Sequence, residues 1–314
     1  MTLSRNWPSA AGLALGYLAD RVFGDPRRGH PVAVFGAAAG WLERRCYADR
    51  HGTGLMLAAA LVGAVASFGA ALERMTANRP TAKILTTAVA TWTVLGGRSL
   101  AREAATIAQQ LSGGELIAAR DQVRNLVGRD TAELSADEVA RATVESVAEN
   151  ASDAVVAPLL WGAVAGLPGL LGYRAVNTLD AMIGHRSPRY RRFGWASARL
   201  GDLLNLVPAR LAALGVAAWA PVVAGTADNA LRVVLRDAGQ HPSPNAGVIE
   251  AAFAGALDVR LGGCNVYDGT VEDRGILGDG RTAQVADIAR ASRLANAVCI
   301  SALIMAVVIR GWRS

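Results

Sequence analysis

Long apolar runs alternate with charged blocks along this 314-residue chain. Residues 55–72 and 294–309 are apolar runs that contain no charged side chain. A helix needs about 20 such residues to cross the hydrocarbon core of a bilayer, so each run predicts a membrane-spanning helix. A shorter apolar run at 84–97 predicts a second span beside the first, and the run at 10–18 predicts a retained helix rather than a cleaved leader.

Two further apolar runs, at 154–171 and 211–225, are interrupted by proline and glycine. Residues 24–54 and 98–153 are rich in arginine, and the positive-inside rule places both on the cytoplasmic side. A single crossing at 154–171 would carry the arginine-rich block at 173–210 outside, which the same rule opposes. We therefore expect a broken segment that is re-entrant or lies buried among other helices.

The composition favours a helical membrane protein. Apolar residues make up 52% of the chain and charged residues 18%, below the ~25% typical of soluble domains. Aromatic residues account for only 5%, so the apolar residues are mostly small and suited to close helix packing in a bilayer. We predict an all-α, polytopic membrane protein with several transmembrane or re-entrant helices and cytoplasmic helical loops, forming one integral-membrane domain over residues 1–314.

The net charge of +6 is due almost entirely to arginine, because Lys83 is the one lysine. Nucleic-acid binding is one interpretation of a basic chain, but no basic run with interleaved aromatics occurs, so we favour membrane loops and an anionic substrate. The cysteines Cys46, Cys264 and Cys299 have neither zinc-ligand nor disulfide-framework spacing. The sequence also lacks the P-loop, Rossmann, HExxH and GxSxG motifs.

Residues 129–161 begin as a charged helix, end as an apolar run and contain the main candidate chemistry. Ser135 followed by Glu138 is a capping box, which predicts that a helix begins there. One face of this helix is apolar and should pack on a neighbouring helix; it consists of Ala140, Val144, Val147, Ala148 and Ala151. The other face is charged at four-residue steps, with Asp137, Arg141, Glu145 and Glu149.

Two interpretations of the charged face stay open. It is a solvated surface with i,i+4 ion pairs, or Glu145, Glu149 and Asp153 hold Mg²⁺ or a cationic group of a substrate. The adjoining membrane segment supports the second interpretation, because carboxylates are costly at a membrane boundary unless they meet cations, metal or water.

Other polar residues share helix faces further along the chain. Asn177 and Asp180 lie three residues apart, as do Arg199, Asp202 and Asn205. Hydrogen bonding at a helix surface explains each set alone. Together with the carboxylates of the earlier helix, these side chains would suit phosphate and Mg²⁺.

Three loop features complete the candidates. Residues 260–263 read as a glycine turn, and two interpretations of it stay open: its N–H groups bind an anion, or it is only a tight turn. The turn at 244–247 should cap a helix that leads to Glu250. His30 is read as a loop residue with a satisfied ring nitrogen, and contact with substrate or phosphate is the alternative.

Seven segments in this order resemble the adenosylcobinamide-phosphate synthase family, the integral-membrane cobalamin-biosynthesis proteins of the CobD/CbiB type. They are GDPRRGHPV (24–32), VGRDTAEL (127–134), VESVAENASDAVVAPLLW (144–161), NTLDAMIGHR (177–186), RYRRFGWASARLGDLLNLVPARL (189–211), PNAG (244–247) and ALDVRLGG (256–263). The resemblance covers nearly the whole chain. This sequence departs from the family pattern at Gly201-Asp202, where a paired acid is common, and at Cys264, where proline is common.

The resemblance implies an amide-forming ligase in the cell membrane, with its active site facing the cytoplasm. It would join adenosylcobyric acid, a corrinoid, to aminopropanol or aminopropanol phosphate, with ATP and Mg²⁺ as the expected cofactors. The expected partners are these substrates and the lipid bilayer, with other cobalamin-pathway enzymes as an open alternative and no nucleic acid.

Residue chemistry assigns hypothetical roles within that reaction. The candidate catalytic residues are Glu145, Glu149 and Asp180. The candidate residues for binding substrate or phosphate are His30, Arg129, Asn150, Asn177, Arg186, Arg199 and Asn245. The candidate metal ligands are Glu149, Asp153 and Asp202.

Two other classes of protein remain as alternatives. A Mg²⁺-dependent membrane transferase would use Asn177 and Asp180, but the second acidic cluster that such enzymes need does not appear in the sequence. A transporter or a scaffold of the corrin pathway would not need these carboxylates for turnover, and the inverted repeats that favour transport are not apparent.

Overall fold

The computed structural model describes residues 6–26, 29–185, 187–267 and 269–312. Most of these residues are helical, and the only strands among them form one small sheet. Four helical stretches are long and apolar enough to cross a membrane, namely His51–Met75, Ala136–Ile183, Trp195–Val223 and Val285–Trp312. The prediction of a polytopic helical membrane protein is therefore confirmed.

Contacts along the chain group the residues into two compact units. The first unit comprises Met1–Gly96, Asp153–Asn205 and Ala302–Ser314, and the second comprises Gly97–Ser152 and Leu206–Ser301. Three long helical stretches contribute residues to both units. A single integral-membrane domain stays a prediction.

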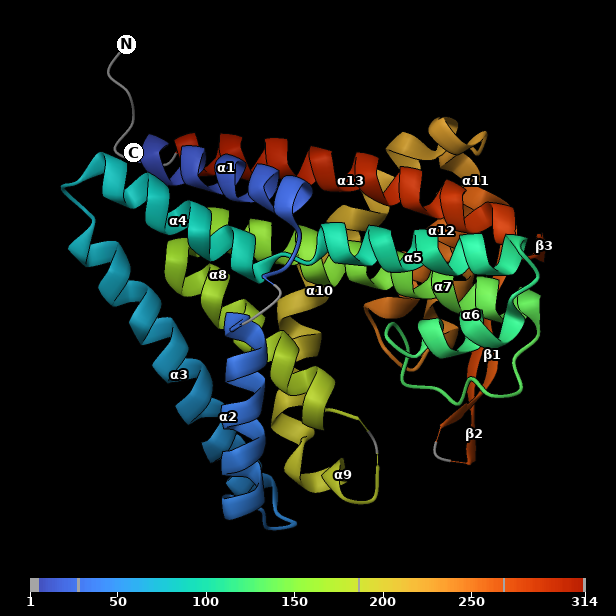
Figure 1. Ribbon diagram of the computed structural model, residues 1–314, viewed down its shortest axis with the longest axis horizontal. Coiled ribbons are helices and arrows are strands. Elements are labelled where there is room, and N and C mark those ends of the chain that lie inside the picture. Colours follow the sequence, from blue (N-terminus) through green and yellow to red (C-terminus); the bar gives the residue numbers. More distant parts are fainter. Residues whose placement is uncertain (1–5, 27–28, 186, 268, 313–314) are drawn as a thin grey trace. The chain divides into compact units, whose positions relative to one another are not determined.

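The first unit is a helical assembly (Figure 1). Its elements are α1 (Trp7–Phe23), α2 (Pro31–Cys46), α3 (His51–Met75), α4 (Pro80–Val94), α8 (Ala157–Ile183), α9 (Tyr190–Phe193), the start of α10 (Trp195–Trp219) and the end of α13 (Val285–Trp312). Helix α1 packs along α4, and α3 packs along α8. The predicted runs at 10–18 and 55–72 thus become α1 and α3, whereas the run at 84–97 gives only the 15-residue α4, which is not among the four candidate spans.

The predicted break in the apolar run at 154–171 is confirmed at Gly166. Its φ of 67° and ψ of −151° interrupt the helical backbone of α8, two residues before Pro168. The carboxylate of Glu73 and the guanidinium of Arg310 form an ion pair, and both would touch a Cβ atom placed on Gly166. A left-handed φ and this close approach together require glycine at the break.

Close packing of α3 against α9 leads to a stability prediction. A Cβ atom on Gly54 would lie 1.7 Å from the carbonyl oxygen of Phe193, whereas one on Gly63 in the same helix would meet nothing within 4 Å. We expect Gly54→Ala to destabilise the protein by about 1–3 kcal/mol, because backbone must move. Gly63→Ala should be neutral or stabilising by up to about 1 kcal/mol through helix propensity. Thermal unfolding of the detergent-purified pair tests this, and equal midpoints would contradict it.

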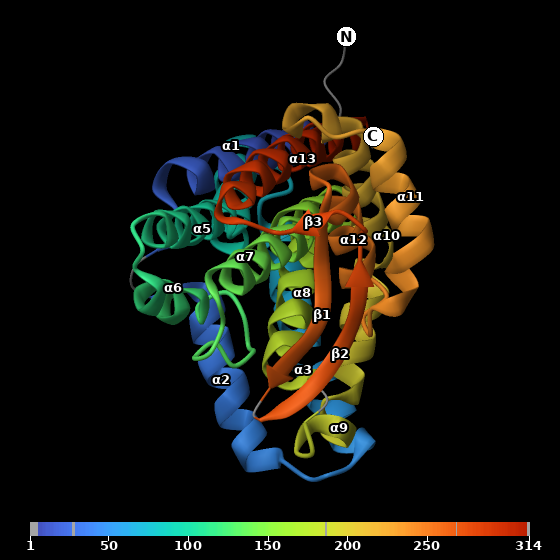
Figure 2. The same ribbon diagram turned by 90° about the vertical axis from the view of Figure 1, so that its right-hand side faces the viewer.

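The second unit combines helices with the sheet (Figures 1 and 2). Its elements are α5 (Gly97–Ser112), α6 (Leu116–Val123), α7 (Ala136–Ala151), the remainder of α10, the 3-10 turn η2 (Ala220–Val223), α11 (Ala227–Asp237), η3 (Ala238–Gln240), α12 (Ala246–Leu257), β1 (Val259–Tyr267), β2 (Thr270–Leu277), β3 (Arg281–Thr282) and the start of α13. A π-helical turn, η1 (Ser152–Val156), continues α7 into α8. Helix α12 packs against α7, α11, β1 and β2.

The capping box at the start of α7 is confirmed. Ser135 Oγ accepts from the N–H of Glu138 at 3.3 Å, and the Glu138 carboxylate accepts from the N–H of Ser135 at 2.8 Å. The predicted apolar face is buried at every position, including Ala140, Val144 and Ala148. Helix α7 therefore begins where local sequence specifies and packs with the predicted face inward.

The sheet was not predicted. Strand β1 pairs antiparallel with β2 and parallel with β3, and an irregularity falls between Gly262 and Cys264 (Figure 2). The predicted glycine turn at 260–263 is wrong, because these residues lie within β1. Gly262 and Gly263 have φ values of 77° and 82°, so the glycines serve a bulged strand rather than a turn.

Candidate active site

A buried ion pair forms the centre of the candidate site, within the second unit. Arg129 lies in the α6–α7 connection and Glu145 lies on α7, and they are 7% and 4% exposed. Arg129 Nη2 donates to Glu145 Oε2, and Arg129 Nη1 donates to Asn265 Oδ1 of β1 at 2.9 Å. The backbone N–H of Gly262 donates to Glu145 Oε1 at 2.7 Å. The bulged strand thus supplies an N–H group to an anion, as the sequence suggested, but that anion is a side chain of the protein.

The Glu145 carboxylate favours the charged form of Arg129. Burial alone would lower the pKa of Arg129, but the Glu145 carboxylate outweighs burial and raises it. Arg141, one turn before Glu145, lies with its Nε 4.0 Å from Glu145 Oε1 and donates from Nη2 to Asn265 Oδ1 at 3.2 Å. The interpretation of this helix face as solvated is therefore wrong at Glu145, although an i,i+4 ion pair is present.

Glu250 adds a carboxylate that the sequence analysis did not assign. Every residue of α12 is buried, and Glu250 is its one charged residue, with 3% exposure. Burial, followed by the carboxylates of Glu145 and Glu149, raises the pKa of Glu250 well above its ordinary value. A lone acid within the apolar sequence AGVIEAAFAGAL was a signal that could have identified it.

His241 lies beside Glu250. Its Nδ1 accepts from the N–H of Ser243 at 3.0 Å, and its Nε2 lies 3.9 Å from Glu250 Oε1. Burial, then the positive charge of Arg274, lowers the pKa of His241. The ring is therefore neutral near pH 7, and its Nδ1 also lies 3.2 Å from the carbonyl oxygen of Ser243, so these contacts fit either tautomer.

Several buried donors around this centre have no hydrogen-bond partner among the residues that the structure describes. They are the Nε atoms of Arg129, Arg141 and Arg274, Nε2 of His241 and Nδ2 of Asn265. An unsatisfied buried donor costs about 1–3 kcal/mol, so such a concentration within one unit is typical of a binding site rather than a packed core. The available donors suit an anionic group, while Glu149 and Glu250 suit a cationic one.

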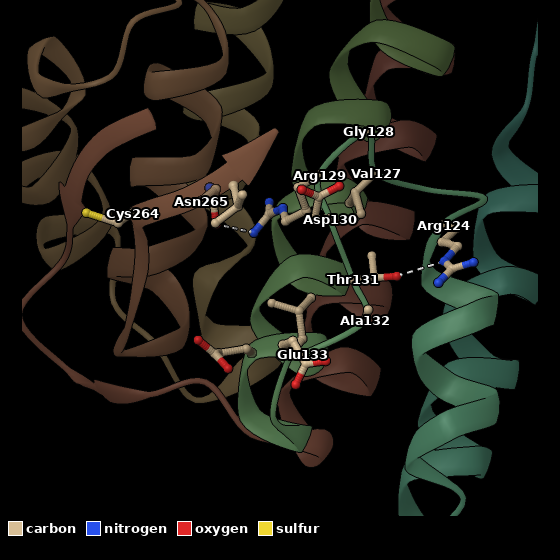
Figure 3. Close-up of a pocket in the computed structure, with 13 residues that line it drawn as sticks. Arg124, Val127, Gly128, Arg129, Asp130, Thr131, Ala132, Glu133, Cys264 and Asn265 are labelled. Atoms are coloured by element: carbon tan, nitrogen blue, oxygen red, sulfur yellow. Dashed lines mark hydrogen bonds between the residues drawn. The ribbon is translucent and has the colours of Figure 1, made fainter. Parts of the chain in front are cut away.

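A pocket of about 740 Å³ opens beside the Arg129–Asn265 pair. Its walls are the α6–α7 connection from Arg124 to Leu134, Glu138, and residues 264–266 of β1. Figure 3 shows Arg129 reaching toward Asn265 at one side, with Arg124 bonded to Thr131 at the other. Carboxylates also line the pocket, at Asp130, Glu133 and Glu138. The lining therefore carries both signs of charge.

The remaining candidates of the second unit have structural partners. Asn150 Nδ2 donates to the carbonyl oxygen and the hydroxyl of Ser146, at 3.0 and 3.1 Å. Asn245 is buried and accepts from Arg210 at 3.1 Å. The helix predicted after residues 244–247 is confirmed as α12, but Ser243 Oγ, at 3.2 Å from the N–H of Ala246, provides the cap.

A second polar cluster lies within the first unit. The Tyr173 hydroxyl lies 2.8 Å from Asn205 Oδ1 and 3.0 Å from the Asp153 carbonyl oxygen, and Asn205 Nδ2 donates to Asp153 Oδ2 at 3.4 Å. One turn along α8, Asn177 accepts from Arg174 at 3.2 Å. The structure thus places Asp153 and Asn177 in a different unit from Glu145 and Glu149.

The other candidates of the first unit lie on α8, on α10 and in the loop before α2. The Asp180 side chain of α8 packs closely against Gly201 of α10, since a Cβ atom on Gly201 would lie 2.4 Å from Asp180 Oδ2. Arg199 is exposed on α10 and Asp202 is half-buried there. His30 Nδ1 accepts from the N–H of Val32 at 3.2 Å, which confirms the satisfied loop histidine. Arg186 lies outside the described residues.

A protein-built metal centre does not form from the candidate ligands. Glu149 belongs to the second unit, and Asp153 and Asp202 belong to the first. Within the described ranges, no group of three or more His, Cys, Asp or Glu residues could hold a metal ion. These residues therefore do not fit a dedicated Mg²⁺ cage of the kind that carboxylate clusters provide.

The fold and this centre define a polytopic helical membrane protein with a buried, mixed-charge site next to a small sheet. The family model described as CobD/Cbib protein matches residues 13–295. The chain belongs to this CobD/CbiB family.

Curated relatives cover almost the same length. A cobalamin biosynthesis protein CobD from Mycobacterium tuberculosis is 52% identical over 300 residues, which is 96% of this chain and 95% of the relative. Proteins of the same name from Geobacter metallireducens and Rhodobacter capsulatus are 46% and 45% identical over 268 and 269 residues, covering 83% and 84% of this chain and 84% of each relative. No solved structure matches.

Proposed function

We propose that this protein acts in cobalamin biosynthesis as an amide-forming ligase. It joins the free propionate of adenosylcobyric acid to the amine of aminopropanol or aminopropanol phosphate. Family membership supports the role in cobalamin biosynthesis. The observation that carries the proposed chemistry is the buried centre of the second unit, where Glu149 and Glu250 adjoin the Arg129–Glu145 pair.

Amide formation requires an activated acyl group and a deprotonated amine. In the proposed reaction a propionate oxygen attacks the γ-phosphorus of ATP, ADP leaves, and an acyl phosphate results. The amine nitrogen then attacks the acyl carbon and phosphate leaves. The ammonium gives up two protons in all, one of which ends on the phosphate and one on a protein base. A buried carboxylate with a raised pKa, such as Glu250, is suited to accept that proton.

The unpartnered donors of Arg129, Arg141 and Arg274 support a phosphate-bearing substrate. Arginine binds phosphate oxygens through charge-assisted bonds that are about twice as strong as neutral ones. The neighbouring carboxylates would at the same time hold an ammonium group. A centre with both signs of charge therefore favours aminopropanol phosphate over aminopropanol.

The requirement for ATP and Mg²⁺ is part of the proposal. Mg²⁺ commonly binds through nucleotide phosphates, waters and one or two carboxylates, so it needs no cage built by the protein. The transferase alternative, with Asn177 and Asp180 as metal ligands, gains no support from Asn177, whose Oδ1 accepts from Arg174 at 3.2 Å.

A ligation assay on the detergent-purified full-length protein tests the proposal. Adenosylcobyric acid, aminopropanol phosphate, ATP and Mg²⁺ should yield the amide by mass, and omission of ATP should remove it. Glu149→Gln should abolish the product. Asp180→Asn tests whether the first unit also contributes. Folded protein that gives no amide with either amine would overturn the ligase proposal and leave a transporter or scaffold.

We further propose the cell membrane as the location, with the arginine-rich end of α3 in the cytoplasm. This orientation can be read from Cys46, which is exposed at the end of α2. In a background with Cys264→Ser and Cys299→Ser, an impermeant maleimide should label Cys46 in inverted vesicles and not in right-side-out cells. Asn78→Cys, in the exposed turn at the opposite end of α3, should behave in the reverse way. Equal labelling patterns at both positions would contradict the orientation.

A further inference from the structure

One end of the first unit carries exposed arginine and tryptophan side chains that the proposed reaction does not use. We call it the Arg/Trp surface and define it by Trp41, Arg44, Arg45, Arg50, Arg191 and Trp195, all of which are exposed. They come from the end of α2, the residue before α3, helix α9 and the start of α10. Figure 1 shows α9 beside the lower ends of α2 and α3 in that view.

Specific contacts hold these elements together. Tyr47 donates its hydroxyl to the carbonyl oxygen of Arg189 at 2.8 Å, and Arg189 Nη2 donates to Glu43 at 2.7 Å. The Tyr47 ring packs on Phe193, with centroids 5.2 Å apart, and His51 packs edge-on against Trp195 at 5.6 Å. The exposed arginines therefore extend from helix ends that pack against one another, and not from independent loops.

The charge of this surface is not neutralised locally. Glu43 is already engaged by Arg189, and Asp49 lies 3.7 Å from Arg192. Arg44, Arg45, Arg50 and Arg191 have no acidic partner among the described residues. Arg45 instead lies over the Trp41 ring, 4.6 Å from its centroid. Four unpaired cations beside two half-exposed indoles remain available to an anionic partner.

Helix α3 fixes where this surface lies in a bilayer. It is 25 residues long with a mean hydropathy of 2.2, and only 17% of its apolar window is buried. At 1.5 Å per residue the helix is about 37 Å long, a little more than a hydrocarbon core of ~30 Å. Its first turn, at His51, therefore falls at the headgroup level, where tryptophan and arginine are favoured.

We infer that the Arg/Trp surface binds anionic phospholipid headgroups, with the indoles of Trp41 and Trp195 at the interface and the four arginines on lipid phosphates. The opposite end of α3 also carries cations, Arg74 and Arg79, and its Glu73 is paired with Arg310, so the inference rests on the combination of arginine with tryptophan and not on a charge difference between the two ends. The inference depends on the membrane character of the protein and not on the ligase reaction.

Titration with short-chain phosphatidylglycerol tests the inference on the detergent-purified full-length protein. The readout is the thermal unfolding midpoint, with phosphatidylcholine of the same chain length as the neutral lipid. We expect a saturable rise in the midpoint with phosphatidylglycerol only, and loss of that rise at about 1 M salt, where the Debye length is ~3 Å. Each basic residue near an anionic surface raises the binding constant roughly fivefold, so three substitutions should weaken binding on the order of a hundredfold.

The matched variants are Arg44→Gln/Arg45→Gln/Arg191→Gln and the same three positions changed to lysine. The glutamine variant should lose the response, and the lysine variant should keep it, because both basic residues are attracted by anionic lipid. An unchanged response in the glutamine variant overturns the inference. Loss in both folded variants would still place the phosphatidylglycerol site at these three positions, and would show that it requires the bidentate geometry of arginine rather than positive charge alone.

Discussion

Arg129→Ala should lower the free energy of unfolding by about 3–5 kcal/mol, because it leaves the Glu145 carboxylate buried without its cation. Amide formation should fall below detection in the same variant. Arg129 is 7% exposed and donates to both Glu145 and Asn265, so its removal leaves two buried acceptors without this donor. Thermal or denaturant unfolding in detergent measures the first effect, and the ligation assay measures the second.

A double variant separates stability from chemistry. Arg129→Met/Glu145→Gln removes both charges, and the glutamine oxygen can still accept from the N–H of Gly262, which lies 2.7 Å from Glu145 Oε1. Replacing a buried ion pair by neutral groups of similar volume is often close to neutral for stability. We therefore expect the double variant to recover most of the lost unfolding free energy while it stays inactive.

The control is an ion pair at the surface of the same unit. Arg232 lies 3.3 Å from Asp279, and both side chains are about half-exposed. Arg232→Ala should have little measurable effect on unfolding, since exposed pairs contribute little. Recovery of ligation in the double variant would show that the Arg129–Glu145 pair is structural only, and the site assignment would then be wrong.

Local signals in the sequence predicted the helices well. The capping box at Ser135 and the apolar face of α7 each depend on residues within a few positions of one another, and each is confirmed. The sheet depends on non-local pairing. Strand β1 contains two glycines with positive φ and a register irregularity, which hide the alternating pattern that indicates a strand.

The prediction that Glu145, Glu149 and Asp153 form one acidic row along the helix is only partly correct, for a geometric reason. Steps of four residues join Glu145, Glu149 and Asp153 on an ideal α-helix, but the backbone becomes π-helical from Ser152 to Val156. A π turn contains more residues than an α turn, so the later positions leave the row. Asp153 consequently bonds with Asn205 in the first unit, while Glu145 bonds with residues of the second.

The centre of the candidate site could not be derived from spacing. Arg129 precedes Glu145 by 16 positions, and Gly262 follows it by 117. Only the fold brings these groups together, so sequence reasoning identified Arg129 and Glu145 as separate candidates without their contact. Glu250 differs, because its position in a fully apolar helix was visible in the sequence.

Glu250→Gln should slow ligation by about 10²–10⁴-fold and make the protein more stable at alkaline pH. Burial and the carboxylates of Glu145 and Glu149 raise the pKa of Glu250 in the folded protein. Between its unfolded pKa, about 4.3, and its higher folded pKa, the native state binds more protons than the unfolded state. This contribution to stability is complete below the unfolded pKa and is lost as pH rises through the folded pKa. Glutamine cannot ionise and does not incur that loss.

The pH dependence of unfolding distinguishes Glu250 from its neighbour His241. The pKa of His241 is lowered by burial, so its contribution has the opposite sign and is lost as pH falls from about 6.5 through the lower folded pKa. The difference between wild type and Glu250→Gln, measured from pH 5 to 9, isolates the carboxyl group. It should grow in favour of the variant as pH increases.

Measurement of activity decides whether the buried Glu250 carboxyl group takes part in the reaction. If Glu250 accepts the proton that the amine loses, glutamine should reduce kcat by about 10²–10⁴-fold, the usual contribution of a general base. A protein that gains stability and loses turnover from one isosteric change has an acid retained for function rather than for folding. Conversely, full kcat in the glutamine variant with the expected stability profile would leave Glu149 as the base to test.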